Sequence, residues 1–285
     1  MASRIHPSRP VLVEPLAPSD LAALTALSQA VAWPHRADDL SLLLALGRGR
    51  VARERAGDDV AAGVAMWWPW GEDAATLGMV IVDPARQGQG IGRRLVEAVL
   101  ADIGPRPVRL NATEAGAPLY AKLGFRPCRV FRQHQGDVDV LPAMAGARLA
   151  EPAERAALGA LDAAAFGAPR QGLVDRLLAE GEFHVLPEPA PARGFAVRRR
   201  FGRGQLIGPL VAPDEAHAIA LLEAALVRGF VRIDVDANAS ALGARVEALG
   251  MSVVDTVVEM VRGDWPGDED PSRPRRLALA AQALG

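Results

Sequence analysis

A run of apolar residues at positions 76–82 leads through a glycine-rich turn directly into a helix that ends near residue 103. The turn contains Gly88, Gly90 and Gly92. A strand that turns through glycines into a helix presents unpaired backbone N–H groups at the positive end of the helix dipole. This arrangement binds a phosphate group. The sequence therefore predicts a local anion site within a mixed α/β fold.

Other classes of glycine-rich turn do not match these residues. A Walker loop needs a lysine followed by serine or threonine, and a Rossmann fingerprint needs G-x-G-x-x-G after an early strand. This turn has no lysine, and its G-x-G-x-G lies in the middle of a domain. Arg86, Arg93 and Arg94 are near enough in sequence to add positive charge to the anion site.

The spacing Q-x-x-G-x-G at residues 87–92 resembles the pyrophosphate loop of the GNAT superfamily of N-acetyltransferases. A second motif of that family follows in the expected order, as Leu-Asn-Ala-Thr at 110–113 and Leu-Tyr-Ala-Lys-Leu-Gly-Phe at 119–125. The resemblance covers residues 11–135. It implies transfer of an acetyl group from acetyl-CoA directly to an amine, without a covalent enzyme intermediate.

The resemblance also assigns residues by their positions. Ile81 and Val82 would offer backbone groups to the pantetheine arm and the thioester, because their strand splays from its neighbour. Asn111 would sit beside the pantetheine, and Tyr120, the only tyrosine in the chain, would protonate the leaving thiolate as general acid. The pyrophosphate would be cradled by Gln87, Gly88, Gln89, Gly90, Ile91, Gly92 and Arg93.

The general base and the acceptor site are less defined. Glu72 and Asp73 are candidates for the base, but an exposed acidic turn is the alternative, and many GNAT relatives use water. Four tryptophans lie in segments that flank the acceptor cleft of the resembled fold, and they would suit an aromatic or cationic amine. Packing in the core or at the rim is the alternative for two of the three in the later cluster. The four are Trp33, Trp67, Trp68 and Trp70, of which Trp33, Trp68 and Trp70 are the substrate-binding candidates.

The second half of the chain repeats the order of elements in the first. When Pro84 is aligned with Pro213, the helix at 91–103 lies opposite residues 216–227, and the strand at 108–112 lies opposite 231–235. We therefore expect two tandem GNAT-like domains, each a mixed, mostly antiparallel sheet flanked by helices.

The second copy has lost the residues that the first would use. Ile219 and Leu221 stand opposite two loop glycines, Val246 stands opposite Tyr120, and the carboxylates of Asp214 and Glu215 stand where a pyrophosphate would bind. Like charges repel. The second half thus resembles the degenerate C-terminal domain of tandem GNAT proteins, and we expect it to bind no coenzyme by the usual mode.

These patterns predict a catalytic GNAT domain at residues 1–140, a degenerate GNAT-like domain at 141–263 and a C-terminal tail at 264–285. The tail contains an acidic run at 268–270 and several prolines, so we expect it to be solvated. Residues 275–284 have the pattern of a last helix.

Composition limits the partners and the compartment. A formal net charge of -2, with 23% charged residues, gives no bulk field for a nucleic acid or an anionic membrane. A small-molecule amine is therefore the expected acceptor, with no nucleic acid or membrane partner. The scattered histidines match no metal motif, so we expect no metal. A single cysteine, no apolar run typical of a signal peptide and no window long enough for a membrane span favour the cytoplasm.

Two alternatives to a small-molecule acetyltransferase stay open. One is a non-catalytic protein that binds or senses acyl-CoA, and the other is an acetyltransferase for a protein lysine or N-terminus. The sequence identifies neither the acceptor nor the acyl chain length. The fused second half could replace the partner subunit of a GNAT homodimer, so either a monomer or a homodimer is expected.

Overall fold

The computed structural model describes residues 11–142, 146–186, 193–266 and 273–285. The chain divides into two compact units. Unit 1 comprises Met1–Trp68 and Leu77–Gly104, and unit 2 comprises Pro69–Thr76 and Pro105–Gly285.

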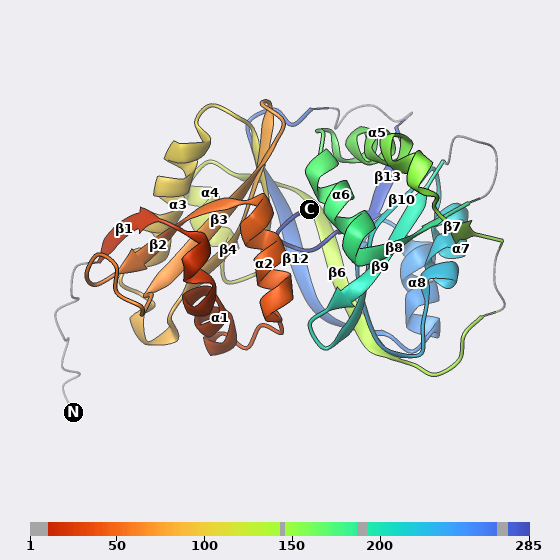
Figure 1. Ribbon diagram of the computed structural model, residues 1–285, viewed down its shortest axis with the longest axis horizontal. Helices are drawn as coiled ribbons and strands as arrows, with labels where there is room; N and C mark the ends of the chain where they lie inside the picture. The colour runs from red at the N-terminus through yellow and green to blue at the C-terminus, as the bar shows by residue number, and fades with distance from the viewer. Residues whose placement is uncertain (1–10, 143–145, 187–192, 267–272) are drawn as a thin grey trace. The chain divides into compact units, whose positions relative to one another are not determined.

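Unit 1 contains a sheet in the strand order β1-β2-β3-β4, with helices packed against it (Figure 1). The pairs β1–β2 and β2–β3 are antiparallel. β3 and β4 cross the boundary between the units. The elements are β1 (Leu12–Pro15), η1 (Pro18–Asp20), α1 (Leu21–Ala30), α2 (Ala37–Leu46), β2 (Arg48–Arg53), β3 (Gly63–Trp70), β4 (Ala74–Val82), η2 (Pro84–Arg86) and α3 (Ile91–Ile103).

The helix α3 is held by one apolar face, as its four-residue periodicity predicts. Leu95, Val96, Val99 and Ile103 are each no more than 1% exposed. Gly63 permits the close approach of β3 to β4, because a Cβ there would lie 2.8 Å from the carbonyl oxygen of Ile81. The core of unit 1 therefore fixes both the end of β4 and the start of α3.

Unit 2 contains the rest of the strands. Its sheet runs from the first residues of β4 in the order β4-β5-β12-β6-β11-β13-β10-β9-β8-β7 (Figure 1). The elements are β5 (Val108–Ala112), α4 (Ala117–Lys122), β6 (Arg126–Val138), β7 (Arg148–Leu149), η3 (Pro152–Glu154), α5 (Arg155–Phe166), α6 (Gln171–Glu180), β8 (Gly181–Val185), β9 (Phe195–Phe201), β10 (Gly204–Ala212), α7 (Glu215–Ala225), β11 (Gly229–Asp236), α8 (Ser240–Ala248), β12 (Ser252–Arg262) and β13 (Arg275–Ala278).

The strands that follow the short helices α4 and α8, β6 and β12, are exchanged between the sequence halves within unit 2. β12 belongs to the second half but pairs antiparallel with β5 of the first, for example Glu259 with Asn111. β6 belongs to the first half but pairs antiparallel with β11 of the second, from Val138 to Phe131. β6 and β12 also pair with each other. Because of this exchange, the boundary between the compact units does not follow the sequence repeat.

The predicted repeat is confirmed by the strand registers. β4 runs parallel to β5, with Ala75 opposite Val108, and β10 runs parallel to β11, with Gln205 opposite Val231. The mixed α/β class with mostly antiparallel pairing is likewise confirmed. The two halves therefore have their secondary-structure elements in the same order, with matching parallel strand pairs.

The short helices that follow β5 and β11 also correspond. α4 and α8 are followed by glycines with positive φ, Gly124 at 85° and Gly250 at 91°. Val246 precedes Gly250 by the same interval that separates Tyr120 from Gly124. The predicted loss of Tyr120 from the second half is therefore confirmed by structure as well as by alignment.

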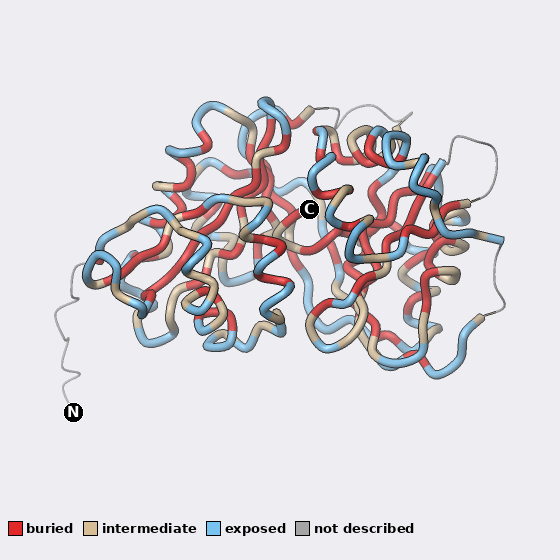
Figure 2. Tube along the Cα trace, viewed as in Figure 1, coloured by how far each residue is buried: buried red, intermediate tan, exposed pale blue. Residues whose placement is uncertain are grey.

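Two predictions about the second half are wrong in detail. Ile219 and Leu221 do not replace loop glycines, because they lie inside α7, and only two residues separate the end of β10 from the start of α7. The glycine loop is deleted there instead of substituted. Residues 275–278 form a strand, β13, where a helix in a solvated tail was predicted. Leu277 and Ala278 are completely buried, since the strand lies within the sheet (Figure 2). The acidic run at 268–270 lies outside the described residues.

None of the helices in the described part of the chain is long and apolar enough to span a bilayer.

A buried ion pair in unit 2 should contribute strongly to stability. Arg170 donates two hydrogen bonds to Asp162, at 2.9 and 2.7 Å, and neither side chain is exposed. We predict that Asp162→Ala lowers the free energy of unfolding by about 3–5 kcal/mol, because it leaves a buried guanidinium without its counterion. Asp175→Ala breaks an exposed pair with Arg155 and should cost under about 1 kcal/mol. Urea denaturation of both variants tests this, and equal losses would contradict it.

Candidate functional site

The glycine loop in unit 1 leaves the N-terminus of α3 open. Gly88 and Gly90 have φ values of 75° and 77°, which only glycine adopts without strain. Gly90 is the N-cap residue of α3, and no side chain caps the helix. A Cβ at either glycine would meet no atom within 4 Å. The first backbone N–H groups of α3 therefore face open space at the positive end of the helix dipole.

The other predicted loop residues support this arrangement. Gln87 and Gln89 are exposed, whereas the Ile91 side chain is in the core, so Ile91 has only its backbone to offer an anion. The Gln87 side chain donates a hydrogen bond of 3.3 Å to the carbonyl of Val82. Gly92 lies in the first turn, with Val82 as the nearest contact for an added Cβ, at 3.4 Å.

The arginines near the loop already have partners within the protein. Arg93 forms an ion pair of 2.8 Å with Glu97 on the exposed side of α3. Arg94 donates to the carbonyl of Val11 at 2.9 Å, and Arg86 forms an ion pair with Glu54. The groups that the loop leaves open to an anion are therefore chiefly its backbone N–H groups.

The strand that leads into the loop has an irregular backbone. Met79 in β4 has a φ of 50°, although it is not glycine and is 4% exposed. A non-glycine residue in this region costs about 1–3 kcal/mol, and such strain is concentrated at functional sites. Ile81 and Val82 follow Met79 directly, so the strain lies beside the residues predicted to contact the pantetheine and the thioester.

Tyr120 lies in α4 of unit 2 and is 8% exposed. Its ring packs edge-on against Phe125, with 5.9 Å between the ring centroids. Its hydroxyl has no hydrogen-bond partner among the described residues. Burial raises the pKa of Tyr120 well above its ordinary value. The phenol therefore remains protonated at physiological pH and has a proton to donate.

Asn111 lies on β5 of unit 2 and has one buried atom without a partner. Its Nδ2 donates a hydrogen bond of 2.8 Å to the backbone carbonyl of Gln282. Its Oδ1 is buried and accepts no hydrogen bond. An unsatisfied buried acceptor costs about 1–3 kcal/mol, so this oxygen is able to accept a hydrogen bond from a further N–H or O–H donor.

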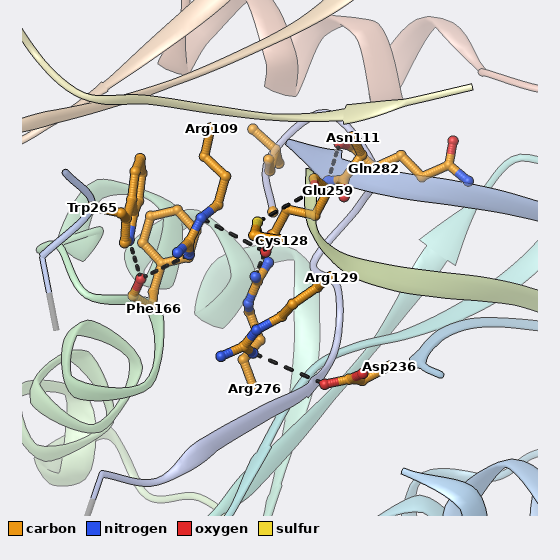
Figure 3. A network of polar contacts seen from close by, with 12 residues as sticks. Arg109, Asn111, Cys128, Arg129, Phe166, Asp236, Glu259, Trp265, Arg276 and Gln282 are labelled. Carbon is orange, nitrogen blue, oxygen red and sulfur yellow. Dashed lines mark hydrogen bonds and ion pairs between the residues drawn. The ribbon is translucent and has the colours of Figure 1, made fainter. Parts of the chain in front are cut away.

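A buried charged network lies beside Asn111, and Figure 3 shows it from close by. Glu259 is opposite Asn111 in the β5–β12 register. The Glu259 carboxylate forms an ion pair with Arg276 and a second, of 3.7 Å, with Arg109. The Arg109 guanidinium also lies 4.1 Å from the ring centroid of Trp265. The three charged side chains are no more than 2% exposed.

Burial alone would raise the pKa of Glu259, but the charges of Arg276 and Arg109 outweigh it and lower this pKa to about 2. Glu259 is therefore a fixed anion that holds the sheet together, and it is not suited to accept a proton from a substrate.

Trp68 and Trp70 belong to the protein core. Trp68 is completely buried, and its indole N–H donates to the carbonyl of Leu43 at 3.0 Å. Trp70 is 4% exposed, and its indole N–H donates to the Thr76 hydroxyl at 2.9 Å. Both are satisfied packing residues, which argues against substrate contact.

Trp33 is half-buried and lies just after Ala32, a non-glycine residue with a φ of 57°. Its ring packs edge-on against His35, with centroids 5.7 Å apart. Glu72 and Asp73, the candidate bases, are exposed in the turn between β3 and β4. Of the three predicted substrate residues, Trp33 is the one that is partly exposed to solvent.

No cluster of three or more potential metal ligands exists among the residues that the structure describes.

Sequence reasoning missed Glu259, Arg276 and Gln282 as neighbours of Asn111. The one available signal was a glutamate within the apolar run Val-Val-Glu-Met-Val of β12. A lone buried charge in a strand needs a partner. The partner cannot be found from the sequence, because it depends on the strand exchange.

The Glu259 network should make stability depend on acid pH. A carboxyl whose folded-state pKa is lowered stabilises the fold above its unfolded pKa, near 4.5, and loses that contribution as the pH falls toward 2. We predict a loss of roughly 3 kcal/mol between pH 5 and pH 2 from this group. Glu259→Gln should be less stable at pH 7 and should show a shallower acid decline.

Urea denaturation at pH 7 and pH 3 measures both effects. Glu97→Gln, which alters the exposed ion pair on α3, is the control and should change stability by less than about 0.5 kcal/mol at either pH. An acid decline that Glu259→Gln leaves unchanged would show that other carboxyls cause it.

Two protein-family models match the chain, one in each half. A model described as an acetyltransferase (GNAT) domain matches residues 47–127, and a second model of the same description matches residues 158–272. The uncharacterized N-acetyltransferase YitH of Bacillus subtilis (strain 168) is 28% identical over 280 residues, which cover 89% of this chain and 91% of that protein.

Solved structures show the same fold. A putative acetyltransferase from Pyrococcus horikoshii superposes with a TM-score of 0.79 at 18% identity, covering 100% of this chain and 99% of the other. A tandem GNAT protein from the clavulanic acid biosynthesis pathway superposes with a TM-score of 0.63 at 18% identity, covering 91% of this chain and 100% of the other. The resemblance to a tandem arrangement of two such domains is thereby confirmed.

Proposed function

Because the chain belongs to the GNAT acetyltransferases, with two such domains in tandem, we propose that its first domain transfers the acetyl group of acetyl-CoA to a primary amine of a small molecule. We assign this domain to residues 1–140 and the degenerate domain to 141–263. The observation that carries the proposal is the uncapped N-terminus of α3 behind a glycine loop. The second half of the chain, where this loop is deleted, serves as an internal comparison.

The residues present fit the coenzyme at two places. The open loop at Gly88 and Gly90 suits a pyrophosphate, since backbone N–H groups and a helix dipole favour an anion that can come close. The orphaned Oδ1 of Asn111 suits an amide N–H, which the pantetheine arm carries. Acetyl-CoA supplies the activated acetyl thioester.

Tyr120 is the proposed general acid. The amine nitrogen would attack the thioester carbonyl carbon, the carbon–sulfur bond would break, and the departing thiolate would take the Tyr120 hydroxyl proton. The attacking nitrogen would lose its extra proton to water, and the tyrosinate would regain a proton from water. The raised pKa of Tyr120 keeps that proton on the oxygen at physiological pH until the thiolate forms beside it. Trp33 remains the candidate for contact with the acceptor, because its indole is half-buried and an aromatic face suits a cationic amine.

A charge placed in the glycine loop should abolish coenzyme binding. Gly90→Glu puts a carboxylate at the N-terminus of α3, and Gly90→Gln puts a neutral group of the same shape there. Both variants carry the same backbone strain, so their difference reports charge alone. We predict one acetyl-CoA site per chain by calorimetric titration, with Gly90→Glu at least about 100-fold weaker than Gly90→Gln.

The proposal fails if the wild-type chain does not bind acetyl-CoA or if Gly90→Glu binds as tightly as Gly90→Gln. If the site is confirmed, a screen of primary amines for the release of free CoA identifies the acceptor.

Removing the Tyr120 hydroxyl should affect turnover and leave binding unchanged. With the best amine from that screen, we predict that Tyr120→Phe lowers kcat about 10²–10⁴-fold while the Kd for acetyl-CoA stays within about threefold. Steady-state turnover assays measure kcat, and calorimetry measures the Kd for acetyl-CoA. Unchanged kcat would remove Tyr120 as the acid.

The pH profile tests the same residue independently. Since the pKa of Tyr120 is raised, the acid form should persist through pH 10. We predict that kcat/KM rises as the acceptor amine loses its proton and does not fall again below pH 10. A falling limb with a midpoint below pH 9 that disappears in Tyr120→Phe would mean that the pKa is lowered instead.

A further inference from the structure

The strand β13 occupies an opening between β10 and β11 in the second half. These two strands pair in parallel only at Gln205 and Leu206 of β10, after which the pairing of β10 with β9 shifts register between Ile207 and Leu210. Beyond that shift, β13 lies between them. It pairs with β10 on one side and with β11 on the other. The opening is therefore filled by the chain itself.

The positions that β13 contacts correspond to the proposed coenzyme positions of the first half. Counted from the matching parallel pairs, Val211 and Ala212 correspond to Ile81 and Val82. Both pair with β13, Val211 with Arg276 and Ala212 with Arg275.

The third correspondence lies on the strand opposite. Asp234 of β11 corresponds to Asn111 of β5, counted from the same parallel pairs. The carbonyl of Asp234 accepts a hydrogen bond of 3.1 Å from the backbone N–H of Leu279, in the segment that continues β13. Each position assigned to the pantetheine arm in the first half thus has a counterpart that contacts this C-terminal segment.

At the N-terminus of α7, a carboxylate of the chain lies at the position that corresponds to the proposed phosphate site of α3. The N-cap residue of α7 is Asp214, whose carboxylate accepts a hydrogen bond of 2.9 Å from the backbone N–H of His217. The matching helix of the first half, α3, has no side-chain cap. A carboxylate of the chain thus lies at the helix end where the first domain is open to an anion.

The fit of β13 in the opening is close. A Cβ added at Gly208 would lie 2.0 Å from the carbonyl oxygen of Leu279, so β10 can approach this segment only with glycine there. Leu277, Ala278 and Leu279 are completely buried, and Arg276 forms an ion pair with the buried Glu259. The GNAT family model for the second half ends at residue 272, before β13 begins. β13 therefore lies outside the part of the second half that the family model matches.

We propose that the second domain binds its own C-terminal segment, residues 275–280, as a permanent peptide ligand in place of coenzyme A. The strand takes the position of the pantetheine arm, and Asp214 takes that of the pyrophosphate. Calling the opening a coenzyme slot rests on the proposed function of the first domain, but the occupation of the opening by β13 does not. The mode of binding is addition of a strand, in which backbone hydrogen bonds supply most of the affinity.

Hydrogen exchange of the full-length protein tests the occupation directly. Amides at 275–280 should exchange slowly without any ligand, and an excess of acetyl-CoA should not change their rates. Gly208→Ala should speed their exchange about tenfold or more, because the added methyl displaces Leu279. Gly243→Ala is the control: it adds a methyl where nothing lies within 4 Å, so exchange at 275–280 should stay slow.

Fast exchange at 275–280 in the wild type, or loss of protection on addition of acetyl-CoA, would overturn the proposal. The exchange rates at 275–280 in the absence of ligand are measured without any coenzyme. They can therefore contradict the occupation by β13 while acetyl-CoA binding to the first domain is confirmed, or support it while that binding is not found.

A disulfide lock provides the second test, should Gly208→Ala not fold. Ala212 and Arg275 are directly opposite in the β10–β13 register, and opposed residues in an antiparallel pair have the spacing that a disulfide needs. In a Cys128→Ser background, the double variant Ala212→Cys/Arg275→Cys should oxidise readily. The locked and reduced forms should bind acetyl-CoA equally, because the strand never has to leave. Failure to form the disulfide, or loss of binding only when locked, would overturn the proposal.

Discussion

The exchange of β6 and β12 is the constraint on which the rest of unit 2 depends. Each half gives the strand after its short helix, β6 or β12, to the other, so the strand order of each half is completed by the other half's chain. The exchange brings Glu259 of β12 opposite Asn111 of β5. It also explains why an isolated negative charge is tolerated in a buried strand, since Arg109 and Arg276 reach it from two other strands. Asn111, the proposed coenzyme residue of the first domain, is therefore positioned partly by the second domain.

The two halves share a chain path but differ in what their matching ends present. In the first half, α3 follows β4, has Gly90 as its N-cap residue and is open to an anion at its N-terminus. In the second, the loop is deleted, Asp214 caps the helix, and β13 fills the space between the diverging strands. The C-terminal segment also reaches the first half, because the Gln282 carbonyl accepts the hydrogen bond from Asn111.

Local signals in the sequence were sufficient for the fold class, the repeat and the glycine loop, because each depends on periodicity and on glycine within a few residues. The replacement of Tyr120 by Val246 could be predicted for the same reason. β13 could not. An Arg-Arg-Leu-Ala run beyond an acidic, proline-containing segment has the composition of a tail, and only the opening between β10 and β11 makes it a strand. Trp68 and Trp70 also required the structure, since the sequence does not distinguish a core indole from one that lines a pocket.

The roles proposed for the two domains require one coenzyme per chain, held by the first domain alone. Native mass spectrometry of the full-length protein with excess acetyl-CoA counts bound molecules without any knowledge of the acceptor. We predict a single adduct per chain, which does not increase with coenzyme concentration. Two adducts per chain would contradict the self-occupied second domain, and none would contradict the open loop of the first.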